Sequence, residues 1–312
     1  MKGRIALCSY LISAALTLAC EKGADTGRGR GPEGARSAVR RAAQGPPQSS
    51  GTRTAIESGK IPFDYPAVRT TARPGDYVLA PSSSWIAEAF EKGGDKQTFI
   101  YYGGWLRRAG EHASEVETLT RQRTLVPNAF VIPIRSGERA DSGDILLTSW
   151  ASGSGMQRAY AVGGEPKSPR VRYLDIDWDN PSGFGNKEDV LPANTFHRLH
   201  EPGEVGSTVA CKEGARRTRW IVANQANGKL LTLGFAGRMR VFGKADCENV
   251  PLRVAVKPGD DVYVPIVGAF TAARVARVEP RIGRLWAKYD FGGQEKEEAF
   301  AFANVATTLA LP

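Results

Sequence analysis

The chain has 312 residues, of which 41% are apolar and 24% are charged, and its formal net charge is +9. This composition is typical of a globular protein and excludes disorder of the whole chain. The 35 glycines and 19 prolines favour a turn-rich β protein, while three histidines and four cysteines leave little material for a metal or nucleophile site.

The first twenty residues have the pattern of a secretory leader. Lys2 and Arg4 form a short basic head, and residues 5–19 are an uncharged, mostly apolar run that is too short to span a bilayer stably. The run ends in Leu-Thr-Leu-Ala before Cys20, and this ending resembles the lipobox of bacterial lipoproteins. The resemblance implies acylation of Cys20 and removal of the signal peptide, residues 1–19. A plain signal peptide cut nearby and an uncleaved anchor are the alternatives.

The residue after the cysteine bears on the location. Glu21 is not the aspartate associated with retention of such lipoproteins in the inner membrane. The expected location is therefore the cell envelope, with the protein lipid-anchored in the outer membrane and facing the periplasm or the cell surface. The first expected partner is membrane lipid, reached through acylated Cys20, because two or three acyl chains anchor a protein stably.

Residues 20–66 are predicted to be a disordered, basic tether. Glycine, alanine, arginine, serine and proline dominate this stretch, so it cannot bury enough apolar surface to offset the ordering of its backbone. Its arginines would be attracted to anionic headgroups. A merely solvated linker is the alternative interpretation.

An internal repeat organises the rest of the chain. Four segments open with a glycine turn that leads into an apolar run, at Gly75, Gly143, Gly203 and Gly259. Each segment closes with an asparagine beside apolar residues, at Asn128, Asn194, Asn249 and Asn304. Four starts and four ends in step indicate four copies of one unit. The predicted units are residues 67–136, 137–200, 201–253 and 254–312.

The pattern inside each unit is that of short antiparallel strands. In the fourth unit, residues 273–278 alternate apolar and polar side chains, and residues 285–291 do so again after a Pro/Gly turn. Helices are expected to be few. For residues 85–90 a strand fits the repeat better than a helical turn.

A shared local pattern resembles a known superfamily. The fourth unit has Gly259-Asp260 before a valine-rich strand, an Ala-x-Val second strand and an aromatic-Asp pair at Tyr289-Asp290. These features resemble the Tudor/SH3-like small barrels, and the second unit matches next best. The resemblance implies an all-β fold with four tandem SH3/Tudor-like barrels after the signal peptide and the linker. One β-sandwich or a propeller is the alternative.

The cysteines fit this layout. Cys8 lies in the leader and Cys20 would carry the lipid, so Cys211 and Cys247 of the third unit remain. In an SH3-like barrel the first and last strands come close together, and the periplasm permits oxidation. We therefore predict a disulfide between Cys211 and Cys247, with two buried thiols as the alternative.

Three carboxylates alternate along one predicted strand. Asp175, Asp177 and Asp179 would point to one face, and such a face could hold Ca²⁺. The spacing departs from a calcium-binding loop, because Asn180 and Asn186 stand where that loop needs glycine and glutamate. A solvated strand end is the better interpretation, and no metal site is predicted.

Aromatic residues are the candidate ligand contacts, because Tudor-like barrels can form aromatic cages for cations. The run from Tyr101 to Trp105 is expected to be the most exposed one and the best contact patch. Core packing is the alternative role for all of them. The candidate contacts are Tyr101, Tyr102, Trp105, Trp150, Tyr173, Trp286 and Tyr289.

No catalytic motif is found. The three histidines are scattered without zinc spacing, and there is neither a Gly-x-Ser-x-Gly elbow nor a phosphate-binding loop. The chain is not expected to be an enzyme or to need a cofactor. The basic third unit favours an anionic envelope polymer as a partner, beside an envelope protein, and nucleic acid is not expected in this compartment.

The predicted function is that of a membrane-anchored envelope lipoprotein. Its tandem barrels would act as a non-catalytic, multivalent binding or scaffolding module. A calcium-dependent or enzymatic protein that uses the face of Asp175, Asp177 and Asp179 is the alternative.

Overall fold

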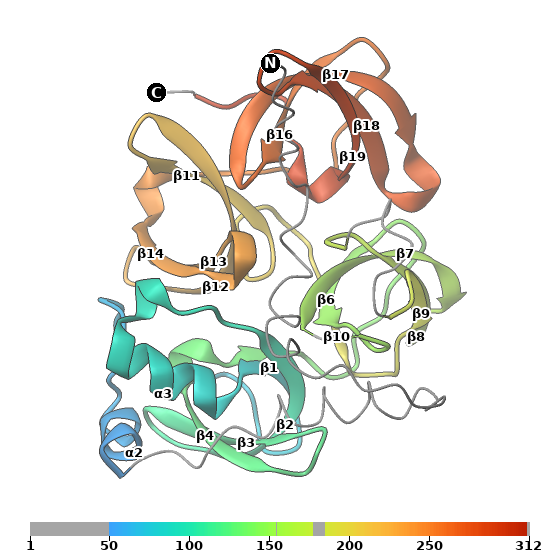
Figure 1. The fold of residues 1–312 in the computed structure, drawn as a ribbon. Coiled ribbons are helices and arrows are strands. Elements are labelled where there is room, and N and C mark those ends of the chain that lie inside the picture. The colour runs from blue at the N-terminus through green and yellow to red at the C-terminus, as the bar shows by residue number, and fades with distance from the viewer. Residues whose placement is uncertain (1–49, 154, 177–184, 311–312) are drawn as a thin grey trace, which may run out of the picture. The chain divides into compact units, whose positions relative to one another are not determined.

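The computed structural model describes residues 50–153, 155–176 and 185–310. These residues belong to one compact unit, Pro46–Pro312, and most of their regular structure is β-strand. Figure 1 draws four successive groups of strands, coloured from green to red along the chain. The leader and most of the predicted tether lie outside the described residues.

The first barrel is a five-stranded antiparallel sheet with the order β4-β3-β2-β1-β5. A ten-residue helix, α3 (Ser83–Lys92), connects its first two strands. The strands are β1 (Tyr77–Pro81), β2 (Tyr101–Ala109), β3 (Ala113–Thr118), β4 (Arg123–Pro127) and β5 (Ile132–Pro133).

The second barrel repeats this order as β10-β6-β7-β8-β9. The last strand again pairs with the first, so that the sheet curls back toward its own beginning. The strands are β6 (Ile145–Ser149), β7 (Met156–Glu165), β8 (Ser168–Tyr173), β9 (Glu188–Val190) and β10 (Phe196–Arg198).

The third and fourth barrels share a nine-stranded sheet that one residue pair joins, Thr218 with Ala269. The third barrel contains β11 (Thr208–Glu213), β12 (Arg216–Ala226), β13 (Lys229–Leu233), β14 (Met239–Gly243) and β15 (Cys247–Asn249), and β11 pairs with both β12 and β15. The fourth contains β16 (Asp261–Ile266), β17 (Ala269–Glu279), β18 (Arg284–Asp290) and β19 (Glu295–Ala301), and Tyr263 of β16 also pairs with Ala306.

All four units therefore have the same strand order. The predicted all-β fold of four small barrels is confirmed.

One backbone turn precedes the first strand of every barrel. In the first barrel the Gly75 N–H donates to the Leu106 carbonyl (2.7 Å), and the Leu106 N–H donates to the Asp76 carbonyl (2.9 Å). The equivalent glycines donate to the second strands of their own barrels over 2.7–2.8 Å. These glycines are Gly143, Gly206 and Gly259. All four have φ between 93° and 96°, a conformation that glycine adopts without steric cost.

The third barrel uses a different glycine from the predicted one. Gly203 was expected because Pro202-Gly203-Glu204 resembles the Pro-Gly-Asp of other units, but Gly206 makes the turn. In the first barrel, Asp76 accepts the N–H of the residue three positions earlier (2.7 Å). Ser207 takes that place in the third barrel, and its hydroxyl accepts the N–H of Gly203 (2.8 Å). A serine can thus cap the turn in place of an aspartate. Because the residue type differs, the sequence does not reveal that Gly206 matches the turn glycines of the other barrels.

A β-bulge lies in the second strand of every barrel, directly after the residue that bonds to the glycine turn. The pairing shifts between Leu106 and Arg108, Ala161 and Gly163, Val222 and Asn224, and Val275 and Arg277. An extra residue bends a strand and increases its twist. The bulge therefore lets each long strand curve around its small barrel.

The asparagines that close the predicted units do not occupy equivalent positions in the barrels. The prediction that each unit closes with a matching asparagine is therefore wrong. A 3-10 turn directly follows the fourth strand of the first, third and fourth barrels, at Asn128–Phe130, Lys244–Asp246 and Phe302–Asn304. Asn128 begins its turn and Asn304 ends its turn, whereas Asn249 lies within β15. The turns share their central alanine instead.

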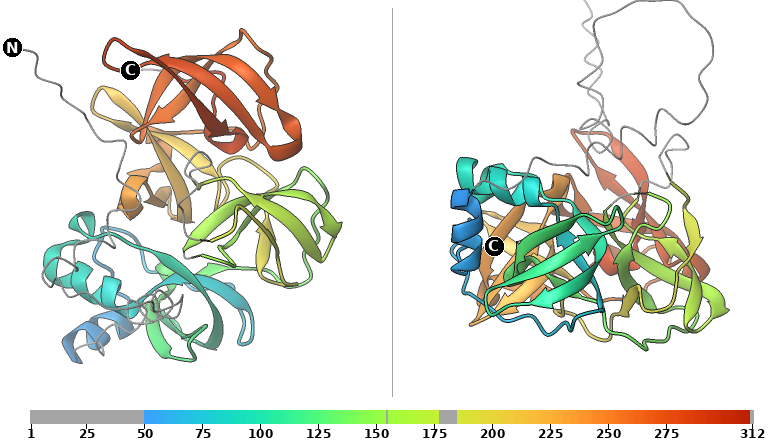
Figure 2. Two further views of the ribbon diagram at one scale, coloured as in Figure 1. Left: turned by 45° about the vertical axis from the view of Figure 1, so that its right-hand side comes forward. Right: turned by 90° about the horizontal axis from the view of Figure 1, so that it is seen from below.

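Two helical segments differ from the predictions. Residues 85–90, expected as a strand, belong to α3, because Ile86 and Ala89 share one helical face and are completely buried. The predicted tether ended at residue 66, but α2 (Ser50–Glu57) buries Ile56 completely, and Tyr65 is 7% exposed. Figure 2 shows both helices beside the first barrel, where they contact β4. For residues 50–66 the expectation of disorder is therefore wrong.

The barrels are packed against one another. The largest buried apolar cluster contains side chains from all four, from Val78 in the first to Ala303 in the fourth. The first and third barrels also share backbone and side-chain hydrogen bonds: the Phe99 N–H donates to the Gly237 carbonyl (2.7 Å), and the Asn224 amide donates to the Ala129 carbonyl (3.1 Å). The four units are thus parts of one body.

Candidate functional site at a three-barrel junction

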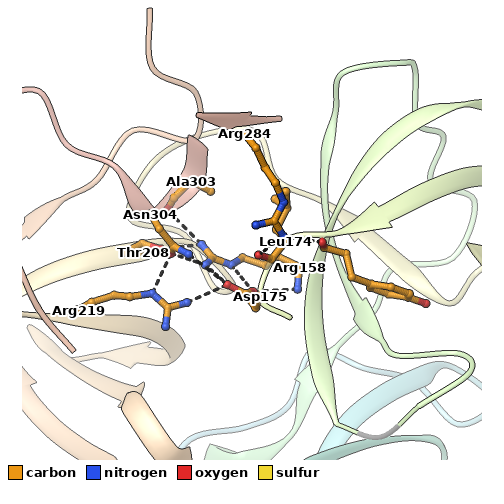
Figure 3. Close-up of polar contacts among 9 residues, drawn as sticks. Arg158, Leu174, Asp175, Thr208, Arg219, Arg284, Ala303 and Asn304 are labelled. Atoms are coloured by element: carbon orange, nitrogen blue, oxygen red, sulfur yellow. Dashed lines mark hydrogen bonds and ion pairs between the residues drawn. The ribbon is translucent and has the colours of Figure 1, made fainter. Parts of the chain in front are cut away.

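A buried ionic cluster lies where the second, third and fourth barrels meet (Figure 3). Its centre is Arg158 of β7, whose side chain is completely buried. The guanidinium binds Asp175 through two hydrogen bonds, from Nη2 to Oδ1 (2.6 Å) and from Nε to Oδ2 (2.9 Å). Asp175 lies two residues after β8, so both partners belong to the second barrel.

The third barrel contributes a second arginine and a hydroxyl. Arg219 of β12 donates from Nη2 to Asp175 Oδ1 (2.9 Å), so that Asp175 lies between two arginines. Thr208 of β11 accepts a hydrogen bond from Arg158 Nη1 (2.6 Å). The third barrel is therefore fixed to the second by charged hydrogen bonds, which are shorter and stronger than neutral ones.

The fourth barrel completes the cluster through its last 3-10 turn. Asn304 Oδ1 accepts hydrogen bonds from Arg158 Nη2 (2.6 Å) and Arg219 Nε (2.8 Å), and its amide donates to Asp175 Oδ1 (3.3 Å). The Ala303 carbonyl accepts another bond from Arg158 Nη1 (3.2 Å). Arg158 thus binds residues of three barrels at once.

A neighbouring arginine links the second and fourth barrels again. Arg284 of β18 is 2% exposed and donates from Nη2 to the carbonyls of Tyr173 (3.0 Å) and Leu174 (2.8 Å). The Tyr160 hydroxyl donates in the other direction, to the Pro280 carbonyl (2.8 Å). The positions of the two barrels are therefore set by several directional contacts.

The electrostatics of the cluster follow from its composition of two cations and one anion. Burial by itself would raise the pKa of Asp175, but Arg158 and Arg219 hold that pKa well below its usual range. Burial, reinforced by repulsion from Arg158, lowers the pKa of Arg219 to about 10, although Asp175 opposes the change. Asp175 is therefore ionised and Arg219 protonated at neutral pH, and the second arginine leaves the cluster with a net positive charge.

This arrangement corrects both interpretations of Asp175 as part of an acidic face. Both of its carboxylate oxygens accept hydrogen bonds from arginine side chains, so Asp175 is neither a solvated strand end nor a ligand open to Ca²⁺. Asp177 and Asp179 lie outside the described residues. Among residues 50–153, 155–176 and 185–310, no group of three or more histidine, cysteine or acidic side chains could hold a metal ion.

Three of the candidate ligand contacts are core residues. Tyr101 is 1% exposed, Tyr173 is completely buried and Tyr289 is 5% exposed. The Tyr101 hydroxyl lies 3.8 Å from the Met239 sulfur of the third barrel. The expectation that the run from Tyr101 to Trp105 is the most exposed one is therefore wrong for Tyr101. Alternate residues of a curled strand face the interior, and Tyr101 is one of these.

The other four candidates are half-buried. Tyr102 and Trp105 lie on β2, where the Trp105 ring meets Tyr77 edge-on at 5.7 Å. Trp150 donates to the Asn186 carbonyl (2.9 Å). Trp286 lies under the Arg277 guanidinium at 3.4 Å from the ring centre. Among the seven candidate contacts, the ring pair found in the described part of the chain is Trp150 with Tyr173, whose centroids are 5.8 Å apart.

The predicted disulfide is present. Cys211 of β11 and Cys247 of β15 are bonded, and they are directly opposite in the pairing of these strands, with Cα atoms 4.0 Å apart. The reasoning from the closeness of the first and last strands is thus confirmed. The predicted lipid attachment at Cys20 lies outside the described residues, and no helix among the described residues is long and apolar enough to span a membrane.

A second polar cluster holds the connections on either side of the second barrel. His197 of β10 lies between two carboxylates, with Nδ1 2.6 Å from Glu138 Oε1 and Nε2 3.6 Å from Glu204 Oε2. Glu138 precedes the second barrel, and Glu204 lies at the start of the third. Burial by itself would lower the pKa of His197, but hydrogen bonding and attraction to both glutamates raise it.

This geometry predicts that His197 stabilises the fold in a pH-dependent way. A raised pKa in the folded state gives stability that is complete below the unfolded value of about 6.5 and is lost as pH rises through the folded value. We expect His197→Gln to lower the free energy of unfolding by about 1.5–3 kcal/mol at pH 6 and by less at pH 9. Urea unfolding of both proteins across this range measures the difference, and parallel pH profiles would contradict the prediction.

Comparison with known proteins matches no family and no curated relative. The junction therefore has to be interpreted from its own chemistry. Its charged groups are paired with one another, and they come from segments that only the folded chain brings together. One local signal points to the junction: Arg158, Arg219 and Arg284 each lie in a strand, where a long charged side chain must either reach solvent or find a buried partner.

Proposed function

We propose that this chain is a membrane-anchored lipoprotein of the cell envelope that acts as a non-catalytic scaffold. The observation that carries the proposal is the junction of Arg158, Asp175, Arg219 and Asn304, which fixes three barrels to one another. A scaffold needs binding surfaces at constant spacing, and preorganised surfaces bind partners at a lower entropic cost. The proposed partners are an envelope protein or an anionic envelope polymer.

The anchoring part of the proposal is supported by the leader and Cys20. The basic head, the apolar run and the Leu-Thr-Leu-Ala-Cys ending have the order that lipid attachment requires. The Cys211–Cys247 disulfide fits an oxidising compartment outside the cytoplasm. The shared strand order, glycine turn and bulge support the assignment of the barrels to the SH3/Tudor-like class.

The four barrels would act together and not as independent modules. Because they share one apolar core cluster, deletion of one barrel would expose the buried faces of its neighbours. The barrels would therefore bind their partners at fixed positions on one body, and not as modules that move independently. Single-barrel deletions are unsuitable as tests for the same reason.

Expression of the full chain and of its Cys20→Ser variant in a bacterial host tests the anchoring. We expect the natural chain in the membrane fraction, without residues 1–19 and with the added mass of acyl chains. The variant should lack that mass and lose its membrane attachment. Because the substitution lies outside the barrels, it should leave the melting temperature unchanged. An unmodified Cys20 in the natural chain would contradict the anchoring.

Chemical cross-linking in intact cells tests the scaffold role. We expect the natural chain to form a recurring cross-link with an envelope component through residues of at least two barrels. The cross-link should weaken in the Cys20→Ser chain, because anchoring keeps the scaffold near its partners. A natural chain that cross-links only to itself would contradict the proposal.

A further inference from the structure

Two exposed apolar residues lie side by side on the third and fourth barrels. Val267 is 69% exposed, and Phe235 is 38% exposed. They are adjacent because a Cβ added to Gly268 would lie 3.2 Å from the Phe235 Cβ. We call Phe235, Ala236 and Val267 the apolar tip. The tip stands on turns whose backbone the barrels hold firmly, since the Gly268 carbonyl accepts a hydrogen bond from the Arg219 N–H (2.7 Å).

The backbone at the apolar tip does not favour the residues found there. Val267 and Gly268 form the two-residue loop between β16 and β17, with φ of +48° and +82°. Such loops strongly prefer Asn-Gly or Asp-Gly, and a β-branched residue at positive φ is a steric outlier. Ala236 also has a positive φ, +56°. Stability of the turn therefore does not explain Val267, whereas a need for an exposed apolar side chain does.

The third barrel, which carries Phe235 and Ala236, is basic. Between residues 208 and 249 the third barrel carries eight basic and three acidic side chains, a net charge of +5 within a total of +9. Arg238 is exposed and follows Phe235 by three residues. Exposed apolar residues with basic neighbours are the combination by which peripheral proteins bind anionic lipid surfaces.

The chain outside the described residues also points to a membrane as the occupant. About 30 residues separate Cys20 from α2, and a chain of this length can bridge a distance on the order of 30 Å. A chain anchored at Cys20 would thus hold the barrels within reach of the bilayer and at a high effective concentration. This step rests on the proposed function, whereas the intrinsic affinity of the apolar tip does not.

We propose that the apolar tip contacts an anionic lipid bilayer and thereby orients the four-barrel body on the membrane surface. Phe235 and Val267 enter the headgroup region, and exposed basic side chains of the third barrel such as Arg238 attract the lipid phosphates. The remaining surfaces of the body then face away from the membrane, where they meet the partners of the scaffold.

Vesicle flotation with residues 21–312 tests this proposal, because this chain contains the whole compact unit but neither the leader nor an acyl chain. The probes are vesicles of phosphatidylcholine alone and of phosphatidylcholine mixed with phosphatidylglycerol. We expect binding to the mixed vesicles that falls as salt is added. Val267→Asn should weaken that binding about fivefold or more while the melting temperature stays equal or rises, because Asn-Gly suits the turn.

The matched control is Leu119→Asn, which removes a 64% exposed apolar residue of the first barrel and should leave vesicle binding unchanged. Phe235→Ser provides a second variant of the apolar tip and should also weaken binding. The proposal is overturned if the natural sequence does not float, if it binds neutral vesicles equally well, or if Val267→Asn binds normally. None of these results touches the acylation of Cys20, so failure here is distinguishable from failure of the anchoring.

Discussion

Replacement of Arg158 by methionine should lower the free energy of unfolding by about 3–5 kcal/mol. Methionine fills similar space without the charge, so Asp175 loses its bidentate partner and remains largely buried beside Arg219 alone. Removal of one partner of a buried ion pair costs this much because the other charge is left uncompensated. Urea unfolding of the natural chain and the variant measures the loss.

The matched control is Arg274→Met in the fourth barrel. Arg274 also pairs with an aspartate, Asp261, but their side chains are 68% and 80% exposed. Exposed pairs contribute about 0–1 kcal/mol because water and salt screen them. If Arg158→Met costs no more than this control, the junction does not stabilise the arrangement of the barrels, and the scaffold proposal loses its main support.

Loss of the Cys211–Cys247 disulfide should cost about 4 kcal/mol. The bond closes a loop of 36 positions, and the entropy that such a loop removes from the unfolded chain corresponds to this value. We expect reductant to lower the melting temperature of the natural chain. The Cys211→Ala/Cys247→Ala double variant should melt at the lower temperature and should no longer respond to reductant. A natural chain that melts identically with and without reductant would contradict the prediction.

The disulfide and the junction are structurally connected. Thr208 and Cys211 lie on the same strand, β11, and Arg219 lies on its neighbour β12. The disulfide ties β11 to the last strand of the third barrel, and Thr208 and Arg219 bind the second barrel. Reduction should therefore loosen both the third barrel and its attachment to the second one.

The repeat could be predicted from the sequence because each of its signals is local. Alternating apolar residues indicate strands, and a glycine that needs positive φ marks a turn, whatever the rest of the chain does. The prediction of Gly203 as the turn glycine was wrong because residue types alone were compared. Pro202-Gly203-Glu204 is more similar to Pro-Gly-Asp than Val205-Gly206-Ser207 is. The hydrogen bonds, which use Gly206 and Ser207, decided the position.

The helix α3 was missed for a related reason. Comparison with the other units predicts a strand at this point, because their sequences show no helical pattern there. Yet Ile86 and Ala89 are three positions apart, which is the spacing of one helical face. The secondary structure of a segment inserted into one copy of a repeat can therefore be predicted only from the spacing of that segment's own apolar residues.

The role of Asp175 could not be predicted from its neighbours in the chain. Asp175 begins a run in which every second residue is acidic, which locally indicates a solvated face, but its partners Arg219 and Asn304 are 44 and 129 positions away. The burial of the aromatic candidates could not be predicted either. Strand alternation indicates that Tyr101 and Tyr102 point to opposite faces, but it does not indicate which face another barrel covers.

By itself, the sequence determined the strands, their grouping into four barrels and the pairing of Cys211 with Cys247. The strands and their grouping depend on residues that are close in the chain. The disulfide depends only on the pairing of the first and last strands within one barrel. Only the tertiary structure decided which charges are buried together, which aromatic rings belong to the core and which apolar residues are left exposed on the turns. The contacts of one barrel with another depend on side chains far apart in sequence, and no local pattern encodes them.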